Sequence, residues 1–136
     1  MVKNVYTSDI GASAIIMGDC QGLLMDHVAT MDNGFYIDDY AIGVMVPNFE
    51  IRTYDCIYQY CEVARQPWSN DGMAWDVDWG NGGTHIYQYN YSHENPNGVY
   101  MLCNAQEASQ GCQVIFRYNI SQNDGTGKFR HSIGSG

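Results

Sequence analysis

The apolar residues of this chain recur in short extended runs rather than along helical faces. In residues 73–78, Met73, Trp75 and Val77 alternate with smaller or acidic residues, and a period of two is that of a β-strand. No segment keeps a 3.6-residue period for three turns, and Gly or Asn-Gly interrupts the apolar runs too often for helices. The pattern predicts an all-β chain of short strands.

One run occurs three times without gaps. The copies begin about 29 residues apart and span 57–63, 86–92 and 115–121. Each is followed by a turn rich in Asn, Asp and Gly and then by a second extended run, at 73–78, 99–103 and 128–133. The same two-part unit recurs upstream with degraded spacing, at 23–29 with 35–40 and at 2–8 with 13–18.

This repeat predicts a solenoid in which each strand pairs in parallel with its copy in the next coil. A β-propeller expects four strands in about 40 to 45 residues, and a leucine-rich repeat expects a Leu-rich consensus; neither pattern is present. We expect one domain over residues 1–133, with Gly134 to Gly136 as a cloning remnant. The expected coils span approximately 1–22, 23–53, 54–83, 84–112 and 113–133.

Three phrases, 71–78, 86–95 and 117–125, resemble the right-handed parallel β-helix repeats of bacterial, often gut-associated, carbohydrate-processing proteins of the pectate-lyase-like superfamily. The likeness covers roughly residues 50–126 well and the rest loosely. It implies a right-handed parallel β-helix of about five coils and a secreted, carbohydrate-active protein. Members are usually longer and capped, so the resemblance also implies that this chain is a fragment. Such coils occur in lyases, hydrolases and non-catalytic modules alike, so the motifs do not specify a reaction.

Alignment of the second strands by their turn glycines places Asp38 in register with Asp76, and Asp78 two residues along on the same outward face. Like charges at this spacing raise the pKa of at least one carboxyl, which suits a general acid beside a carboxylate base. The same three acids could instead share a cation such as Ca²⁺. The alternative is that they lie on the solvated face of an acidic protein.

Other candidate residues lie at the bends. Trp68 and Trp79 flank the 73–78 strand, where an exposed indole could stack on a sugar ring or simply cover the coil end. Arg117 should point outward and could contact substrate or act as a base. His93 lies beside Glu94 and could titrate near neutral pH as a catalytic residue, or be merely solvated.

Further residues are assigned to the scaffold. Tyr58, Tyr87 and Phe116, and likewise Tyr60, Tyr89 and Tyr118, should form inner or bend-facing stacks. Asn90 and Asn119 recur at one position and predict an Asn ladder between coils, although both also read as glycosylation acceptors. Cys103 and Cys112 flank a short loop and could bridge, or all five thiols could be buried between coils.

Charge and composition narrow the function. The net charge of −9 with six Lys plus Arg disfavours nucleic acid and anionic membrane surfaces. No stretch approaches the ~20 apolar residues of a membrane span, and Met1 to Ile10 lack the pattern of a secretion signal. The resemblance to carbohydrate-processing β-helix proteins implies a piece of an extracellular or cell-surface protein.

The sequence leaves three functions open. The first is a carbohydrate-active module that binds or cleaves an extracellular polysaccharide, as a glycoside hydrolase or polysaccharide lyase if it is an enzyme, with no cofactor or with Ca²⁺. The second is a structural or adhesion repeat, possibly a homo-oligomer joined through open coil ends. The third is a binding-only module that depends on Trp68 and Trp79.

Overall fold

The structure, a computed structural model, describes residues 1–11, 13–33, 48–66, 73–77, 80–102, 111–126 and 133–135. These residues form thirteen β-strands, and no helix occurs among them. The described part of the chain accordingly contains no helix that could cross a membrane. The expectation of an all-β chain is confirmed.

The strands form two sheets in which every pairing is parallel. The larger sheet contains β1 (Val2–Ser8), β3 (Leu24–Met31), β5 (Ile57–Gln59), β6 (Glu62–Ala64), β8 (Gly83–Gln88), β9 (Tyr91–His93), β11 (Cys112–Arg117) and β12 (Ile120–Gln122). The smaller sheet contains β2 (Ile15–Gln21), β4 (Asn48–Tyr54), β7 (Trp75–Val77), β10 (Tyr100–Leu102) and β13 (Ile133–Ser135).

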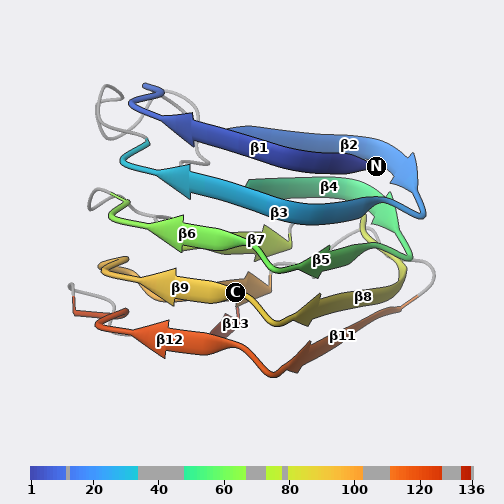
Figure 1. The fold of residues 1–136 in the computed structure, drawn as a ribbon. Coiled ribbons are helices and arrows are strands. Elements are labelled where there is room, and N and C mark those ends of the chain that lie inside the picture. Colours follow the sequence, from blue (N-terminus) through green and yellow to red (C-terminus); the bar gives the residue numbers. More distant parts are fainter. Residues whose placement is uncertain are drawn as a thin grey trace.

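In chain order the path crosses the larger sheet and then the smaller sheet, repeatedly, and from β5 onward two short strands make each crossing of the larger sheet. We call one crossing of the larger sheet followed by one crossing of the smaller sheet a pass; the passes are β1–β2, β3–β4, β5–β7, β8–β10 and β11–β13. Figure 1 shows the strands of the larger sheet one below another, with β2, β4 and β7 behind them. The long strand β3 pairs with β5 through its first half and with β6 through its second half.

The predicted 29-residue register is confirmed in the larger sheet for the last three passes. Ile57 pairs with Ile86, and Ile86 with Ile115. Hydrogen-bonded side chains in this part, such as those of Gln59 and Gln88, are 29 residues apart, whereas Asp26 and Gln59 are 33 residues apart. The sequence therefore predicted the register correctly in the part of the chain where the repeat has a constant length.

Two columns of left-handed backbone run across the larger sheet, one residue in each of the last four passes. His27, Tyr60, Tyr89 and Tyr118 have φ between 53° and 57°, and we call them the aromatic column. Further along each pass, Asp32, Arg65, Glu94 and Asn123 have φ between 51° and 58°, and we call them the charged column. A residue in this conformation turns the strand sharply, which ends β5, β8 and β11 at one column and β6, β9 and β12 at the other.

Side-chain amides connect the passes immediately after these bends. The Asn90 backbone N–H donates to Asn119 Oδ1 at 2.8 Å, and the Cys61 N–H donates to Asn90 Oδ1 at 2.9 Å. After the charged column, the Gln66 N–H donates to Asn95 Oδ1 at 3.3 Å. The predicted Asn ladder is confirmed, and a second ladder of the same kind, which sequence reasoning did not identify, lies beside the charged column.

The core lies between the two sheets and is rich in aromatic residues. Tyr58, Tyr87 and Trp75 are fully buried. The Tyr58 and Tyr87 rings stack 4.5 Å apart, and Trp75 meets Tyr87 edge-on at 6.0 Å. The prediction that Tyr58 and Tyr87 belong to an inner stack is confirmed, and their hydrophobic burial stabilises both sheets together.

The predicted alignment of the second strands is wrong. In the smaller sheet the residue opposite Asp76 is Phe49 on β4 and, on the other side, Met101 on β10. Phe49 thus holds the register position that the alignment gave to Asp38, which itself lies outside the described residues. Aligning the strands by their turn glycines failed because β4 begins at Asn48, well beyond the 35–40 run that the sequence pattern suggested.

Candidate functional site

Asp76 lies at the centre of β7 and is 1% exposed. The prediction that Asp76 points to solvent is wrong, because every residue from Met73 to Val77 is buried. Alternation marks an outward side only where one side of the strand meets water, and on β7 the side chains of both parities, Asp76 as well as Trp75 and Val77, are buried. The predicted partners Asp38 and Asp78, and the bend residues Trp68 and Trp79, lie outside the described residues.

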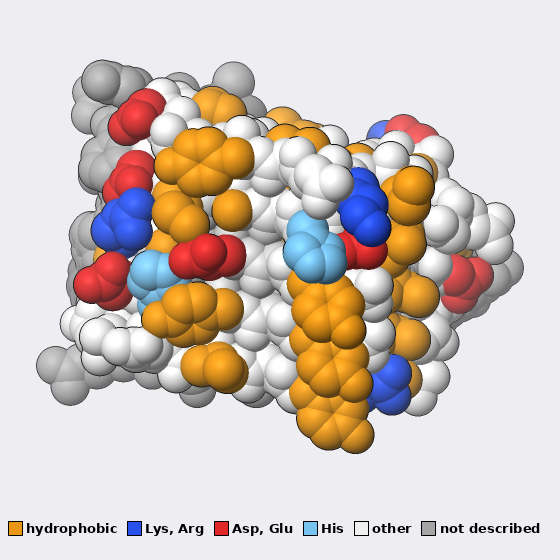
Figure 2. Space-filling view, in the orientation of Figure 1, with side chains coloured by type: hydrophobic (Ala, Val, Ile, Leu, Met, Phe, Trp, Pro, Cys, Tyr) orange, Lys and Arg blue, Asp and Glu red, His pale blue; other side chains and the backbone are white. Residues whose placement is uncertain are grey.

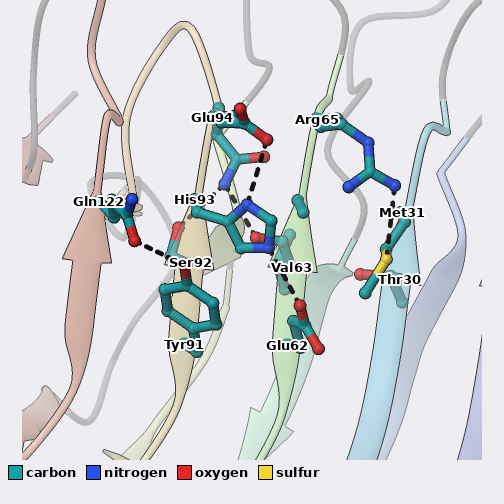
Figure 3. Close-up of polar contacts among 12 residues, drawn as sticks. Thr30, Met31, Glu62, Val63, Arg65, Tyr91, Ser92, His93, Glu94 and Gln122 are labelled. Atoms are coloured by element: carbon teal, nitrogen blue, oxygen red, sulfur yellow. Dashed lines mark hydrogen bonds and ion pairs between the residues drawn. The ribbon is translucent and has the colours of Figure 1, made fainter.

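A second acid-containing cluster is centred on His93 (Figure 3). His93 ends β9, and its Nε2 lies 3.0 Å from Glu62 Oε1 on the neighbouring strand β6. Its Nδ1 lies 3.3 Å from Glu94 Oε2, and the Tyr91 ring stacks on the imidazole with centroids 4.5 Å apart. The predicted proximity of His93 and Glu94 is confirmed, and Glu62 was not predicted.

The chemistry of this cluster follows from its two contacts. A neutral imidazole donates one hydrogen bond and accepts one, so it can hold both carboxyls only if one of them carries a proton. An imidazolium donates two hydrogen bonds and leaves both carboxylates ionised. These two arrangements contain the same number of protons, so a proton can shift between His93 and a glutamate without exchange with solvent. The His93 side chain is 14% exposed, and those of Glu62 and Glu94 are 39% and 51% exposed.

The charged column continues beside this cluster. Arg65 Nη2 lies 2.6 Å from Asp32 Oδ2, and Nε lies 2.9 Å from Asp32 Oδ1, which makes a two-point ion pair between adjacent passes. The Asp32 hydrogen bond raises the pKa of Arg65. Among the described residues, no group of three His, Cys, Asp or Glu side chains is arranged to hold a metal ion. The carboxylates described here contact side chains instead: Asp32 contacts Arg65, and Glu62 and Glu94 contact His93.

The aromatic column presents a strip of ring edges to solvent. The rings of His27, Tyr60, Tyr89 and Tyr118 stack in that order, with centroids 5.1, 5.3 and 5.3 Å apart. Tyr60 is 48% exposed, Tyr89 46% and Tyr118 69%. The prediction of a bend-facing stack is confirmed for these tyrosines. Figure 2 shows a continuous hydrophobic column with a histidine at one end on the face formed by the larger sheet.

A row of hydrogen-bonding side chains lies directly beside this column. We call Asp26, Gln59, Gln88 and Arg117 the polar row; each immediately precedes a residue of the aromatic column. Gln59 donates to Asp26 at 3.4 Å, Gln88 donates to Gln59 at 3.0 Å, and Arg117 donates to Gln88 through Nε at 3.0 Å and Nη2 at 2.7 Å.

The charged members of the polar row lie at its two ends. Arg117 is exposed, as predicted, and its guanidinium lies 5.9 Å from the centre of the Tyr118 ring. At the other end, Lys3 Nζ lies 3.5 Å from Asp26 Oδ2, and His27 contacts the same carboxyl. The His27 hydrogen bond is the main cause of the lowered pKa of Asp26, and Gln59 and Lys3 lower it further.

Sequence reasoning missed a polar cluster inside the core. His85 Nδ1 lies 3.0 Å from Glu50 Oε2, both side chains are fully buried, and the Tyr87 hydroxyl also contacts Glu50. Burial by itself lowers the pKa of His85, but the hydrogen bond and charge of Glu50 outweigh it, so the pKa is raised. His85 and Glu50 are 35 residues apart, and no local motif connects them.

The described thiols are consistent with small core residues. Cys56 is fully buried and Cys61 is 3% exposed, and burial raises the pKa of Cys61 to about 11. The predicted Cys103–Cys112 bridge cannot be placed, because Cys103 lies outside the described residues. Cys56 and Cys61 are protonated near neutral pH and therefore poor nucleophiles.

Comparison with known proteins gives one informative similarity. No family model and no solved structure matches the chain. The chain is similar to a lacto-N-biosidase of Bifidobacterium longum subsp. longum, with 33% identity over 144 aligned residues. The alignment covers 94% of this chain and 8% of that protein. Nearly all of this chain is thus homologous to a small segment of a much longer carbohydrate-active protein.

Proposed function

We propose that the chain is a right-handed parallel β-helix of about five coils, in which each pass is one coil. Three features support this architecture: the chain crosses the two sheets in turn, all pairings are parallel, and equivalent residues form columns across the passes. Amide ladders at the bends belong to the same pattern, because they satisfy backbone groups that the turns leave without a strand partner. The pectate-lyase-like resemblance is retained as part of this proposal.

We infer that the module is carbohydrate-active and belongs to a longer, extracellular glycoside-hydrolase-type protein of bacterial origin. The observation that carries this inference is the alignment of 94% of the chain with the lacto-N-biosidase. Charge favours a neutral polysaccharide, since a net charge of −9 repels anionic chains. A lacto-N-bioside is the first substrate to test, because the name of the relative specifies that activity.

Two places are proposed for acid and base chemistry. The first is the end of β7, where buried Asp76 is followed two residues later in the sequence by Asp78, and where these two carboxylates would share a Ca²⁺ ion if a cation is bound. The second is His93 with Glu62 and Glu94. Its imidazole contacts both carboxyls, so it could take up or release a proton beside either of them.

A structural or adhesive role is the second candidate. It is favoured by the sheet edges: within the described residues, β1 has a single strand partner, β3, and β12 has a single partner, β9. Ile120 on β12 is 64% exposed. Unpaired parallel strands with exposed apolar residues can pair with further strands of a parent protein or with a second copy, and Trp68 and Trp79 would then serve as lids or as binding residues.

Activity measurements separate these functions. The chain is incubated with p-nitrophenyl lacto-N-bioside and with a panel of neutral and anionic polysaccharides, with and without EDTA. Release of p-nitrophenol, new reducing ends and the ultraviolet absorbance of unsaturated sugars are followed. Hydrolysis products without unsaturated sugars are expected, and loss of activity with EDTA would indicate a required cation. The same assay on the intact parent protein covers the case in which catalysis needs residues beyond this chain.

Variants then assign the reaction to one place. Asp76→Asn and Asp78→Asn test the β7 acids, and His93→Gln with Glu62→Gln tests the second cluster. Asp19→Asn is a matched control, because Asp19 is an exposed acid on β2 that pairs with Arg52. Full activity in Asp76→Asn, in Asp78→Asn and in the double variant His93→Gln with Glu62→Gln would overturn both proposed centres. Absence of both activity and glycan binding in the chain and in its parent would overturn the carbohydrate-active function.

A further inference from the structure

The aromatic column and the polar row form one continuous surface. Each pass contributes one aromatic ring and one polar side chain from consecutive residues, such as Gln88 with Tyr89. The rings repeat every 5.1 to 5.3 Å, and the polar side chains are joined by hydrogen bonds along the same direction. This surface therefore presents the same pair of chemical groups once in every pass, from the His27 pass to the Tyr118 pass.

Backbone conformation makes the tyrosines unexpected at these positions. Left-handed φ costs an L-residue about 1–2 kcal/mol, and Gly, Asn or Asp normally occupies it. Three successive passes place Tyr there, whereas the charged column uses Asp, Arg, Glu and Asn at the same backbone geometry. Stacking between the rings offsets part of the cost, but it does not require that nearly half of each ring remain exposed to water. Continuous exposed aromatic surface of this kind is typical of binding sites.

We propose that this surface binds a neutral glycan chain that lies across the passes. Tyr60, Tyr89 and Tyr118 would offer sugar residues the apolar surface of their exposed ring edges and their hydroxyls as hydrogen-bond partners, as amphipathic tyrosines do at interfaces. Gln59 and Gln88 would exchange hydrogen bonds with sugar hydroxyls. The spacing of the passes is close to the length of one pyranose residue, so successive sugars would meet successive tyrosines.

Charge selects a neutral ligand over an anionic one. Stacked aromatics also bind single-stranded nucleic acid, but such sites combine the rings with a strongly basic groove. Here the described basic groups of the surface are Lys3 and Arg117; Lys3 pairs with Asp26 and Arg117 donates to Gln88. The whole chain carries −9. A nearly uncharged strip on an acidic protein is complementary to an uncharged polyhydroxylated chain.

This inference rests on the proposed carbohydrate-active function and assigns it a binding surface. The test is affinity gel electrophoresis of the full chain in gels containing laminarin, xylan or galactomannan. Titration with lacto-N-biose, monitored by tyrosine fluorescence, complements the gels, and a thymidine oligonucleotide is the anionic probe. The main variant is Tyr60→Asn with Tyr89→Asn, because Asn tolerates left-handed φ and keeps the bends. Gln88→Ala tests the polar row. Tyr6→Asn is the matched control, because Tyr6 is 64% exposed on β1 and lies outside the aromatic column.

We expect the double tyrosine variant to bind about tenfold more weakly and Gln88→Ala about threefold more weakly, with Tyr6→Asn unchanged. Wild-type affinity in a double variant with a native circular dichroism spectrum would overturn the binding surface and leave the carbohydrate-active function standing. Failure of the wild-type chain to bind any glycan would overturn both. Preferential binding of the oligonucleotide would replace the glycan with a nucleic-acid strand as the ligand.

Discussion

The aromatic and charged columns share one backbone design and differ in their side chains. In both columns a left-handed residue ends a short strand, and the next residues form an amide ladder to the neighbouring pass. One column presents stacked rings, and the other presents ion pairs such as Arg65 with Asp32. The amide ladder and the left-handed φ angle therefore define the bend. The side chain of the left-handed residue is not needed to form the bend, so it can serve in binding or in ion pairing.

The largest expected effect on the free energy of unfolding comes from a substitution in the buried core. His85→Leu would leave the buried Glu50 carboxylate without its imidazole partner, and we expect the free energy of unfolding to fall by about 3 kcal/mol. Urea denaturation measures this loss. His93→Leu is the control, since its partners Glu62 and Glu94 are partly exposed, and it should cost less than about 1 kcal/mol. Equal losses in the two variants would contradict a buried ion pair.

The next effect tests whether the two bends are equivalent. Asn90→Leu and Asn95→Leu each remove an acceptor for a buried backbone N–H and a donor to a carbonyl. We expect each to lower the free energy of unfolding by about 2–3 kcal/mol, with Gln113→Leu on the exposed surface of β11 as the unchanged control. If only one of the two variants lost stability, the ladder at the other bend would not contribute to the stability of the fold.

The stability of the wild-type protein should depend on pH through His85. The pKa of His85 in the folded protein is raised above its ordinary value of 6.5 by Glu50. This contribution is therefore fully present below pH 6.5 and is lost as the pH rises through the folded pKa. Chemical denaturation at several pH values measures the slope, and His85→Leu should remove it. A slope of the same size in that variant would assign the dependence to other groups.

A smaller effect should have opposite signs in the two columns. Glu94→Gly relieves the cost of left-handed φ, and we expect about 0.5 kcal/mol of stabilisation. Tyr89→Gly gains the same relief but loses stacking with both Tyr60 and Tyr118, so we expect a net loss of about 1 kcal/mol. Thermal unfolding of the pair reports the difference. If both variants were stabilised, stacking would contribute nothing to the aromatic column.

The smallest effect concerns the ion pair of the charged column. Arg65→Gln should cost less than about 1 kcal/mol, because Arg65 and Asp32 are partly exposed and salt screens their attraction. Unfolding measured at low and high salt should show a difference that shrinks as salt is added. A salt-independent loss would indicate that packing of Arg65 against Met31 matters more than its charge.

Regular spacing explains how much could be predicted. The Ile57, Ile86 and Ile115 register and the Asn90–Asn119 ladder follow from a constant repeat, and the structure contains both. The Asp38–Asp76 alignment was wrong because the connections to the smaller sheet vary in length, which a turn glycine does not reveal. Asp76 was assigned to the surface because alternation cannot show that both sides of a strand are covered.

The functional surfaces were predicted less well for a related reason. His93 was recognised beside Glu94 because they are adjacent in sequence, whereas Glu62 lies in the regular register opposite Tyr91 and was missed because the pattern does not show which side chains meet diagonally. The polar row was visible in Gln59, Gln88 and Arg117, yet its extension to Asp26 crosses a 33-residue interval. Where the number of residues between neighbouring passes varies, the contacts depend on the length of the segment that connects the strands. The local pattern of apolar and polar residues does not reveal that length.

The unequal intervals have a consequence for the way such a chain can change over evolution. In the larger sheet, registered positions are separated by 23 residues between the first two passes, by 33 between the next two and by 29 thereafter. The columns nevertheless remain aligned. Insertions in the connections therefore leave the rungs in place, whereas duplication of one whole pass would lengthen every column by one unit. The number of repeats in the gene would then set how many sugar residues the proposed binding surface can contact.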